Sequence, residues 1–168
     1  MNTVIAGKVI ILGNNIDTDQ IYPGRYLELT DPREIGTHCL EGVNPAIAQS
    51  FTRGDIIAAG TNFGCGSSRE HAVIALLNMG VGAIIAESFA RIFYRNAINL
   101  GLPLVVCKGI AEKVKSGQRL RLDIEAGAVT AEDSGEVFGC ERLGDQAMDI
   151  LNAGGIKPLL RKKIQGAL

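Results

Sequence analysis

Residues 60–71 read Gly-Thr-Asn-Phe-Gly-Cys-Gly-Ser-Ser-Arg-Glu-His, a glycine-rich loop that lies between two apolar runs. The preceding run, Asp55–Gly60, is short and rich in isoleucine, which is typical of a buried strand. The following run, Ala72–Met79, has the length and composition of a helix. A strand, a glycine loop and a helix in this order aim backbone N–H groups and the positive end of a helix dipole at one point. The loop therefore predicts a binding site for a small anion.

Two interpretations of Ser67 are open on the residues alone. Ser67 and the glutamate three residues later have the spacing of a capping box, in which the serine only satisfies a free helix N–H. A binding role is favoured by the adjacent Ser68 and by Arg69, which we expect in the first helical turn and whose forked donor suits a carboxylate or phosphate. Glycines at positions 64 and 66 would also let a ligand approach the backbone closely.

Two familiar motifs are excluded by the residues of this loop. A phosphate-binding P-loop needs a lysine before its serine or threonine, and this loop contains none. A nucleophile elbow needs Gly-x-Ser-x-Gly, which the run Gly66-Ser-Ser-Arg69 does not provide. His71 could face Ser67 across one helical turn, but a lone histidine in a first turn more often makes structural hydrogen bonds.

Two other polar clusters follow predicted strands. Asp17 and Asp19 are two positions apart, as in some metal sites, although aspartates in this setting usually hold turns. If this segment shares a sheet edge with the glycine loop, Asp19 would orient or neutralise a group there. Arg91 and Arg95 lie four positions apart on a predicted helix, where they could bind an anion or a partner, or form a solvated face.

The pattern of apolar runs predicts an α/β fold with a partly parallel sheet and flanking helices. Buried strands are expected at 8–12, 55–59, 82–86 and 102–107, with helices at 70–79 and 89–100 that end at Gly80 and Gly101. Alternating strands and helices of this length imply parallel crossovers. Period-two alternation at 118–124, followed by 127–131, predicts an antiparallel hairpin. Two further helices are expected at 145–153 and 157–164.

Composition limits the classes of function. With 168 residues and 46% hydrophobic content, residues 1–168 can form one domain with a single core. A net charge of -1 and 5% aromatic residues argue against nucleic-acid binding. No apolar stretch approaches the ~18–20 residues needed to span a membrane, and no signal peptide is evident. We therefore expect a soluble cytoplasmic protein. Its four cysteines lack the spacing of a zinc site and are expected to be free thiols: Cys39, Cys65, Cys107 and Cys140.

Three segments taken together resemble the small subunits of the aconitase superfamily, most closely the short type found in 3-isopropylmalate dehydratases. They are Asn15-Ile-Asp-Thr-Asp-Gln-Ile21, Phe63-Gly-Cys-Gly-Ser-Ser-Arg-Glu-His71 and Ser88-Phe-Ala-Arg-Ile-Phe-Tyr-Arg-Asn-Ala-Ile-Asn-Leu-Gly-Leu-Pro103. The resemblance extends over nearly the whole chain. It implies the swivelling β/β/α domain that, in single-chain aconitases, closes over an iron–sulfur cluster.

The resemblance also implies residue roles. Ser67 would be the catalytic base, acting as an alkoxide on a substrate C–H, and Asp19 would be the active-site aspartate. Ser68 and Arg69, with the loop backbone at Gly66, would bind a substrate carboxylate. The 4Fe-4S cluster would belong to a separate large subunit. The chain is therefore expected to be inactive alone, to form a hetero-oligomer, and to self-associate when isolated.

The implied reaction is a reversible dehydration and rehydration of a small dicarboxylate, with isopropylmalate of leucine biosynthesis as the first expectation. In the family, a specificity segment corresponds to Tyr26–Leu29, where homoaconitase-like members tend to carry an arginine at the third position. Glu28 stands there in this chain and would repel an additional carboxylate. Leu27 and Leu29 favour an alkyl-bearing malate. Dimethylmalate, citramalate and homoaconitase relatives stay as alternatives, and a non-enzymatic anion-binding module is the rival from another class.

Overall fold

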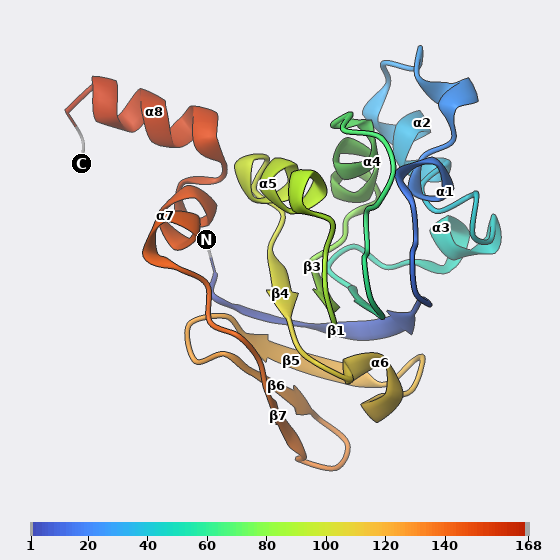
Figure 1. Cartoon of the computed structure of the whole chain (residues 1–168), viewed down its shortest axis with the longest axis vertical. Helices are drawn as coiled ribbons and strands as arrows, with labels where there is room; N and C mark the ends of the chain where they lie inside the picture. Colours follow the sequence, from blue (N-terminus) through green and yellow to red (C-terminus); the bar gives the residue numbers. More distant parts are fainter. Residues whose placement is uncertain (1, 167–168) are drawn as a thin grey trace.

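The structure is a computed structural model, and it describes residues 2–166. Within that range the strands form one seven-stranded sheet in the order β4-β3-β2-β1-β5-β6-β7 (Figure 1). The strands are β1 (Val4–Ile11), β2 (Ile56–Ala59), β3 (Ala83–Ala86), β4 (Leu104–Val106), β5 (Arg119–Asp123), β6 (Ala128–Ala131) and β7 (Val137–Gly139). The helices are α1 (Thr18–Ile21), α2 (Pro32–Thr37), α3 (Ala46–Ser50), α4 (His71–Met79), α5 (Arg91–Asn99), α6 (Ile110–Lys113), α7 (Asp145–Ala153) and α8 (Ile156–Ile164), with a 3-10 turn at Gly24–Tyr26.

One half of the sheet is parallel and the other half is antiparallel. Strands β1 to β4 pair in parallel, with Ile56 of β2 opposite Val9 on one side and Ala83 on the other. Strand β1 also pairs with β5 in antiparallel fashion, and β6 and β7 continue from β5. The predicted parallel strands and the predicted hairpin are confirmed. The sequence did not predict β7, the short strand that completes the antiparallel half.

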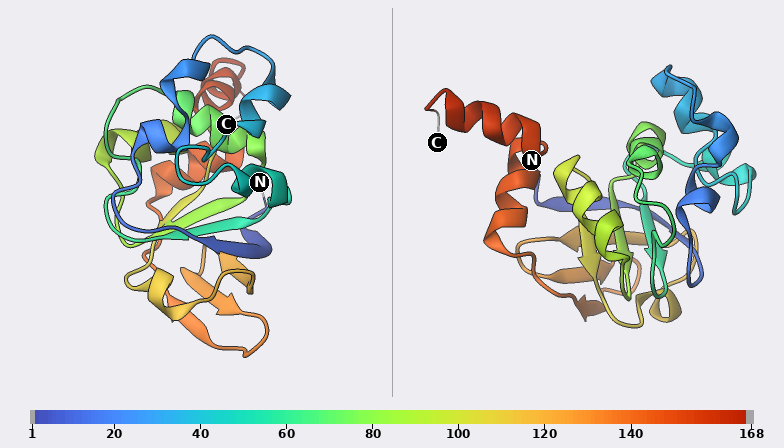
Figure 2. Two further views of the ribbon diagram at one scale, coloured as in Figure 1. Left: turned by 90° about the vertical axis from the view of Figure 1, so that its right-hand side faces the viewer. Right: turned by 45° about the horizontal axis from the view of Figure 1, so that its top comes forward.

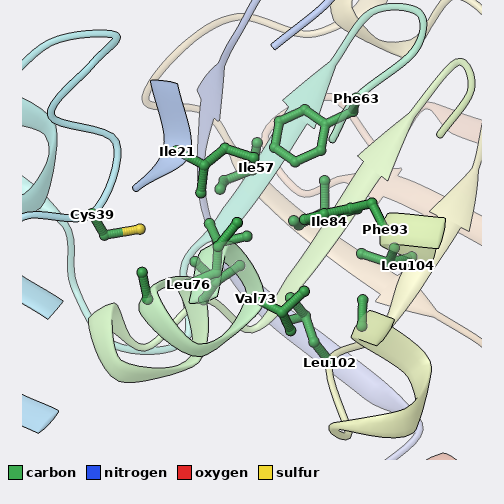
Figure 3. Close-up of a cluster of buried hydrophobic side chains, with 14 of the residues drawn as sticks. Ile21, Cys39, Ile57, Phe63, Val73, Leu76, Ile84, Phe93, Leu102 and Leu104 are labelled. Carbon is green, nitrogen blue, oxygen red and sulfur yellow. The ribbon is translucent and has the colours of Figure 1, made fainter. Parts of the chain in front are cut away.

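Side chains of the parallel strands alternate between two cores, because successive residues of a strand point to opposite faces. One face carries Ile57 and Ile84 and is covered by α4 and α5 (Figures 1 and 3). The other face carries Ile56 and Ile85, and it packs against α6 and apolar residues of β5 to β7. Strands that are buried on both faces explain why these runs are continuously apolar rather than alternating.

The helices α4 and α5 end at the predicted glycines, but both begin later than predicted, at His71 and Arg91. Gly80 has a φ of 97° and ends α4 in the left-handed conformation, as predicted. At its other end α4 begins at His71, with Glu70 as an N-cap that makes no side-chain cap hydrogen bond. Of the two interpretations left open for Ser67, the capping box is therefore not the one observed, and Arg69 precedes the helix instead of lying in its first turn. The short helices α1, α2, α3 and α6 were not predicted.

The C-terminal helices lie to one side of the sheet, and α8 extends away from the body of the molecule (Figures 1 and 2). Both were predicted from the sequence, and α7 packs on α5 as well as on α8. Across residues 2–166, no helix combines the length and apolar character needed to cross a membrane.

Candidate active site

A pocket of about 170 Å³ opens between α1, the turn that follows it, and the loop that leads into α4. The first wall comes from the segment after β1, and the second comes from the glycine-rich loop after β2. Both segments therefore follow neighbouring parallel strands, where the carboxyl ends of the strands meet. The pocket is lined by Thr18, Asp19, Tyr22, Gly24, Leu27, Ser67, Arg69, His71 and Ala72.

Hydrogen bonds join the two walls directly. The backbone N–H of Thr18 donates to the carbonyl of Cys65 at 2.8 Å. In return, the backbone N–H of Ser67 donates to the hydroxyl oxygen of Thr18 at 3.0 Å. Thr18 is buried although its side chain is polar. The expectation that Asp19 and Ser67 lie at the same edge of the sheet is confirmed.

The Ser67 hydroxyl lies in the loop ahead of α4. Its oxygen accepts a hydrogen bond of 3.2 Å from the backbone N–H of Arg69. The first residues of α4, His71 and Ala72, line the same pocket. A negative charge on the Ser67 oxygen would therefore have a backbone donor and the N-terminus of a nine-residue helix close by. The arginine side chain adds a full positive charge to the wall of the pocket.

Phe63 anchors the glycine-rich loop, and Gly64 permits that anchoring. Phe63 is fully buried, with its ring 5.5 Å from that of Phe93 in an edge-to-face arrangement (Figure 3). Gly64 has a φ of 86°, and a Cβ at this position would collide with the Phe93 ring. This packing role replaces the ligand-approach role that we expected of Gly64. Gly66, with a φ of 103°, would place a Cβ 3.1 Å from the Thr18 hydroxyl oxygen.

The two aspartates of the first wall make different contacts. Asp17 is the N-cap of α1, and it forms a complete capping box with Gln20. Asp19 lies on the pocket, and its Oδ1 accepts a hydrogen bond of 3.0 Å from the backbone N–H of Gly24. The structure therefore gives no support to a shared metal site for the pair.

Apolar side chains form the remaining wall. Tyr22 and Leu27 line the pocket, and burial, followed by the nearby Glu34 carboxylate, raises the pKa of the Tyr22 hydroxyl. Leu29 instead packs at the edge of the hydrophobic core, and Glu28 is exposed to solvent. Of the predicted specificity residues, the structure thus places only Leu27 on the pocket wall.

Several predicted residues lie away from this pocket. The carbonyl of Ser68 accepts a hydrogen bond of 3.0 Å from the Asn96 side chain, and Ser68 and Gly66 do not belong to the pocket lining. Arg91 borders a separate hollow beside Tyr94, and Arg95 is exposed.

Sequence reasoning missed Thr18, Tyr22 and Gly24. Thr18 lies inside the Asp-Thr-Asp motif that was singled out, so a polar residue between two aspartates was an available signal. Tyr22 and Gly24 reach the pocket only because the turn after α1 folds back toward Asp19, which the sequence does not indicate.

Comparisons with known proteins identify the family and the fold. The profile of the aconitase C-terminal domain family matches residues 12–109. An isopropylmalate/citramalate isomerase small subunit of Methanocaldococcus jannaschii is 50% identical over 98% of this chain and 98% of that protein. A 3-isopropylmalate dehydratase small subunit of Methanopyrus kandleri is 49% identical over 97% of this chain and 96% of that protein. A crystal structure of 3-isopropylmalate dehydratase from M. jannaschii superposes with a TM-score of 0.91 at 42% identity, covering 98% of both chains.

Proposed function

Because the chain belongs to the aconitase C-terminal domain family, we propose that it is the small subunit of a two-component hydro-lyase of the 3-isopropylmalate dehydratase type. The complete enzyme would interconvert 2-isopropylmalate and 3-isopropylmalate by dehydration and rehydration, a step of leucine biosynthesis that takes place in the cytoplasm. One observation carries this proposal: a single pocket combines Ser67, Arg69 and Asp19 with the apolar side chain of Leu27.

These residues suit a dicarboxylic acid with an alkyl branch. The guanidinium of Arg69 can hold one carboxylate through two parallel hydrogen bonds. Leu27 and Tyr22 offer apolar surface to the alkyl group. Asp19 would accept a hydrogen bond from the substrate hydroxyl and orient it for departure. In this arrangement the carboxylate, the hydroxyl and the alkyl group each have a separate part of the wall.

Proton removal from the substrate carbon is assigned to Ser67. A serine hydroxyl is a very weak base, so its alkoxide must be strongly stabilised. The backbone N–H of Arg69 already donates to the Ser67 oxygen, and the Arg69 side chain and the N-terminus of α4 add positive potential around it. Ser68 would support the carboxylate clamp after the large subunit closes over the loop.

The 4Fe-4S cluster is assigned to the large subunit. Among residues 2–166, no group of three or more histidine, cysteine, aspartate or glutamate side chains could hold a metal ion. Cys39 is fully buried in the hydrophobic core, where burial raises the pKa of its thiol well above the usual range. The cluster would supply a Lewis acid that helps the substrate hydroxyl to leave.

Reconstitution with a cluster-bearing large subunit tests this function. The mixture should hydrate 2-isopropylmaleate, whereas each subunit alone should not. A panel that includes citramalate, 2,3-dimethylmalate and homocitrate would rank the alternative substrates. If an intact, cluster-loaded partner gives neither hydration of 2-isopropylmaleate nor dehydration of any hydroxy acid in the panel, the enzyme proposal fails, and binding of dicarboxylates by the isolated chain would then favour the anion-binding module.

A further inference from the structure

We propose that Glu41, which does not line the pocket, is a positioning residue that fixes the apolar wall at Leu27 and thereby sets the preference for the size of the alkyl group. This inference rests on the proposed function. It depends on a cluster of four side chains, Arg25, Tyr26, His38 and Glu41, which we call the Glu41 cluster.

Glu41 is the centre of this cluster. Its Oε1 accepts hydrogen bonds from the Tyr26 hydroxyl at 2.6 Å and from an Arg25 guanidinium nitrogen at 2.8 Å. Its Oε2 lies 2.6 Å from Nδ1 of His38. The side chain of Glu41 is only 19% exposed. Both carboxylate oxygens are therefore used, and the three partners are held in one geometry.

The rings of the cluster are stacked. The Tyr26 and His38 rings have centroids 3.8 Å apart and planes inclined by 12°. The guanidinium carbon of Arg25 lies 4.7 Å from the centroid of the Tyr26 ring. Tyr26 is thus fixed by a stacking partner, by a cation and by its own hydroxyl bond, which leaves its ring little freedom to rotate.

The position of Tyr26 determines that of Leu27, because the two residues are adjacent in one tight turn. The Leu27 N–H donates to the Gly24 carbonyl at 3.2 Å, and the Tyr26 carbonyl accepts a hydrogen bond of 2.7 Å from the Tyr22 hydroxyl. Asp19 holds the start of the same turn at Gly24. The turn is therefore attached at one end to a pocket residue and at the other end to Glu41.

Glu41 itself is anchored to the first wall. The N–H of the preceding residue, Leu40, donates to the Ile21 carbonyl at 2.7 Å, and the N–H of the following residue, Gly42, donates to the Gln20 carbonyl at 3.1 Å. A Cβ at Gly42 would lie 2.5 Å from the Gln20 Cα, so glycine is required for this approach. The carboxylate is consequently fixed relative to α1. Its hydrogen bonds to Arg25 and Tyr26 then hold the turn in place relative to α1.

The negative charge of Glu41 contributes to holding the Glu41 cluster together. The Tyr26 hydroxyl and then His38 and Arg25 lower the pKa of the Glu41 carboxyl to about 2. The side chain is therefore ionised at any working pH and can accept from all three partners. Glutamine at this position has nearly the same shape but can accept through only one of its two end groups.

Hydrogen exchange of the isolated subunit tests the positioning directly. In Glu41→Gln, the amide of Leu27 should exchange about tenfold faster than in the wild type, while amides of β2 and β3 should be unchanged. Glu132→Gln is the matched control, because it removes the Arg119 ion pair on the far hairpin. Tyr26→Phe, which keeps the ring but loses one bond to Glu41, should give an intermediate rate.

Substrate selectivity tests the consequence in the reconstituted enzyme. For Glu41→Gln, the ratio of kcat/KM for 2-isopropylmalate to that for citramalate should fall about tenfold, mainly through KM, within the range set by one or two methylene groups in an apolar pocket. Glu132→Gln should keep the wild-type ratio. Unchanged exchange at Leu27, or an unchanged ratio in an active enzyme, would overturn the inference. An inactive wild-type pair would instead refute the proposed function, and the exchange result would still show whether Glu41 positions the turn.

Discussion

The hydroxyl oxygen of Thr18 and the backbone N–H of Ser67 form a 3.0 Å hydrogen bond that joins the two walls of the pocket. Replacing the hydroxyl by a methyl group in Thr18→Val would leave this N–H without its acceptor. We expect a loss of about 1–3 kcal/mol in the free energy of unfolding. We also expect a lower kcat, because the position of Ser67 would be less well defined. Urea unfolding and steady-state kinetics measure the two effects.

Thr18→Ser is the control for this change, because it keeps the hydroxyl and removes only a methyl group. It should retain most of the activity of the wild type. Equal losses of kcat in the serine and valine variants would show that the hydrogen bond is not what positions Ser67.

The stability contributed by Glu41 should depend on pH in a defined direction. Its pKa is lowered from 4.5 to about 2 when the chain folds, chiefly by the Tyr26 hydroxyl. A lowered carboxyl pKa contributes stability above 4.5, and this contribution disappears as the pH falls toward 2. The difference in unfolding free energy between the wild type and Glu41→Gln should therefore be fully present well above pH 4.5 and shrink as the pH falls from 4.5 toward 2. A difference that is constant over this range would show that ionisation of Glu41 does not stabilise the fold.

Gly64→Ala should destabilise the chain by about 2–4 kcal/mol, the sum of left-handed backbone strain and crowding against Phe93. Gly135→Ala separates the two causes. Gly135 has a φ of 74° and open space around the position of a Cβ. The Gly135→Ala substitution should therefore lower the free energy of unfolding by only about 1 kcal/mol. Thermal unfolding of both variants measures the difference. If the two variants lose the same free energy of unfolding, packing of the loop on Phe93 does not stabilise the fold.

Glu28→Arg should increase the use of tricarboxylates relative to isopropylmalate. Glu28 is exposed directly after Leu27, so its replacement adds a cation without disturbing the core. The gain should be several-fold, because an exposed ion pair contributes about 0.2–1 kcal/mol. Glu28→Gln removes the negative charge alone and should give a smaller gain. Relative kcat/KM values for homocitrate and 2-isopropylmalate that match the wild type in both variants would show that residue 28 does not select the substrate.

The fold was largely predictable because its central strands are buried on both faces, and such strands leave continuous apolar runs in the sequence. The helix C-termini were equally visible, since Gly80 and Gly101 take the left-handed conformation that glycine favours. Short elements were not predictable. Helix α2 and strand β7 depend on tertiary packing, and six or three residues carry too little periodicity to stand out.

The site was predictable in part: Asp19, Ser67 and Arg69 lie on one pocket as expected, whereas Ser68 and Glu28 do not line it. Spacing alone made Ser67 a plausible cap, but the helix begins four residues later, and the capping box lies instead at Asp17 and Gln20. The Glu41 cluster left no sequence signal, because Tyr26 and Glu41 are 15 positions apart and no periodic pattern connects them. Contacts of this kind become visible only when the turn is folded against α1.

Ser67→Ala in the reconstituted enzyme tests the central claim most directly. The measurement is the single-turnover rate at which 2-isopropylmalate is converted to 2-isopropylmaleate, together with the substrate dissociation constant and the extent of subunit assembly. We predict that the rate falls by a factor of about 100 to 10,000, the usual contribution of a positioned base, while binding and assembly change little. A rate close to that of the wild type would contradict the assignment of Ser67 as the base.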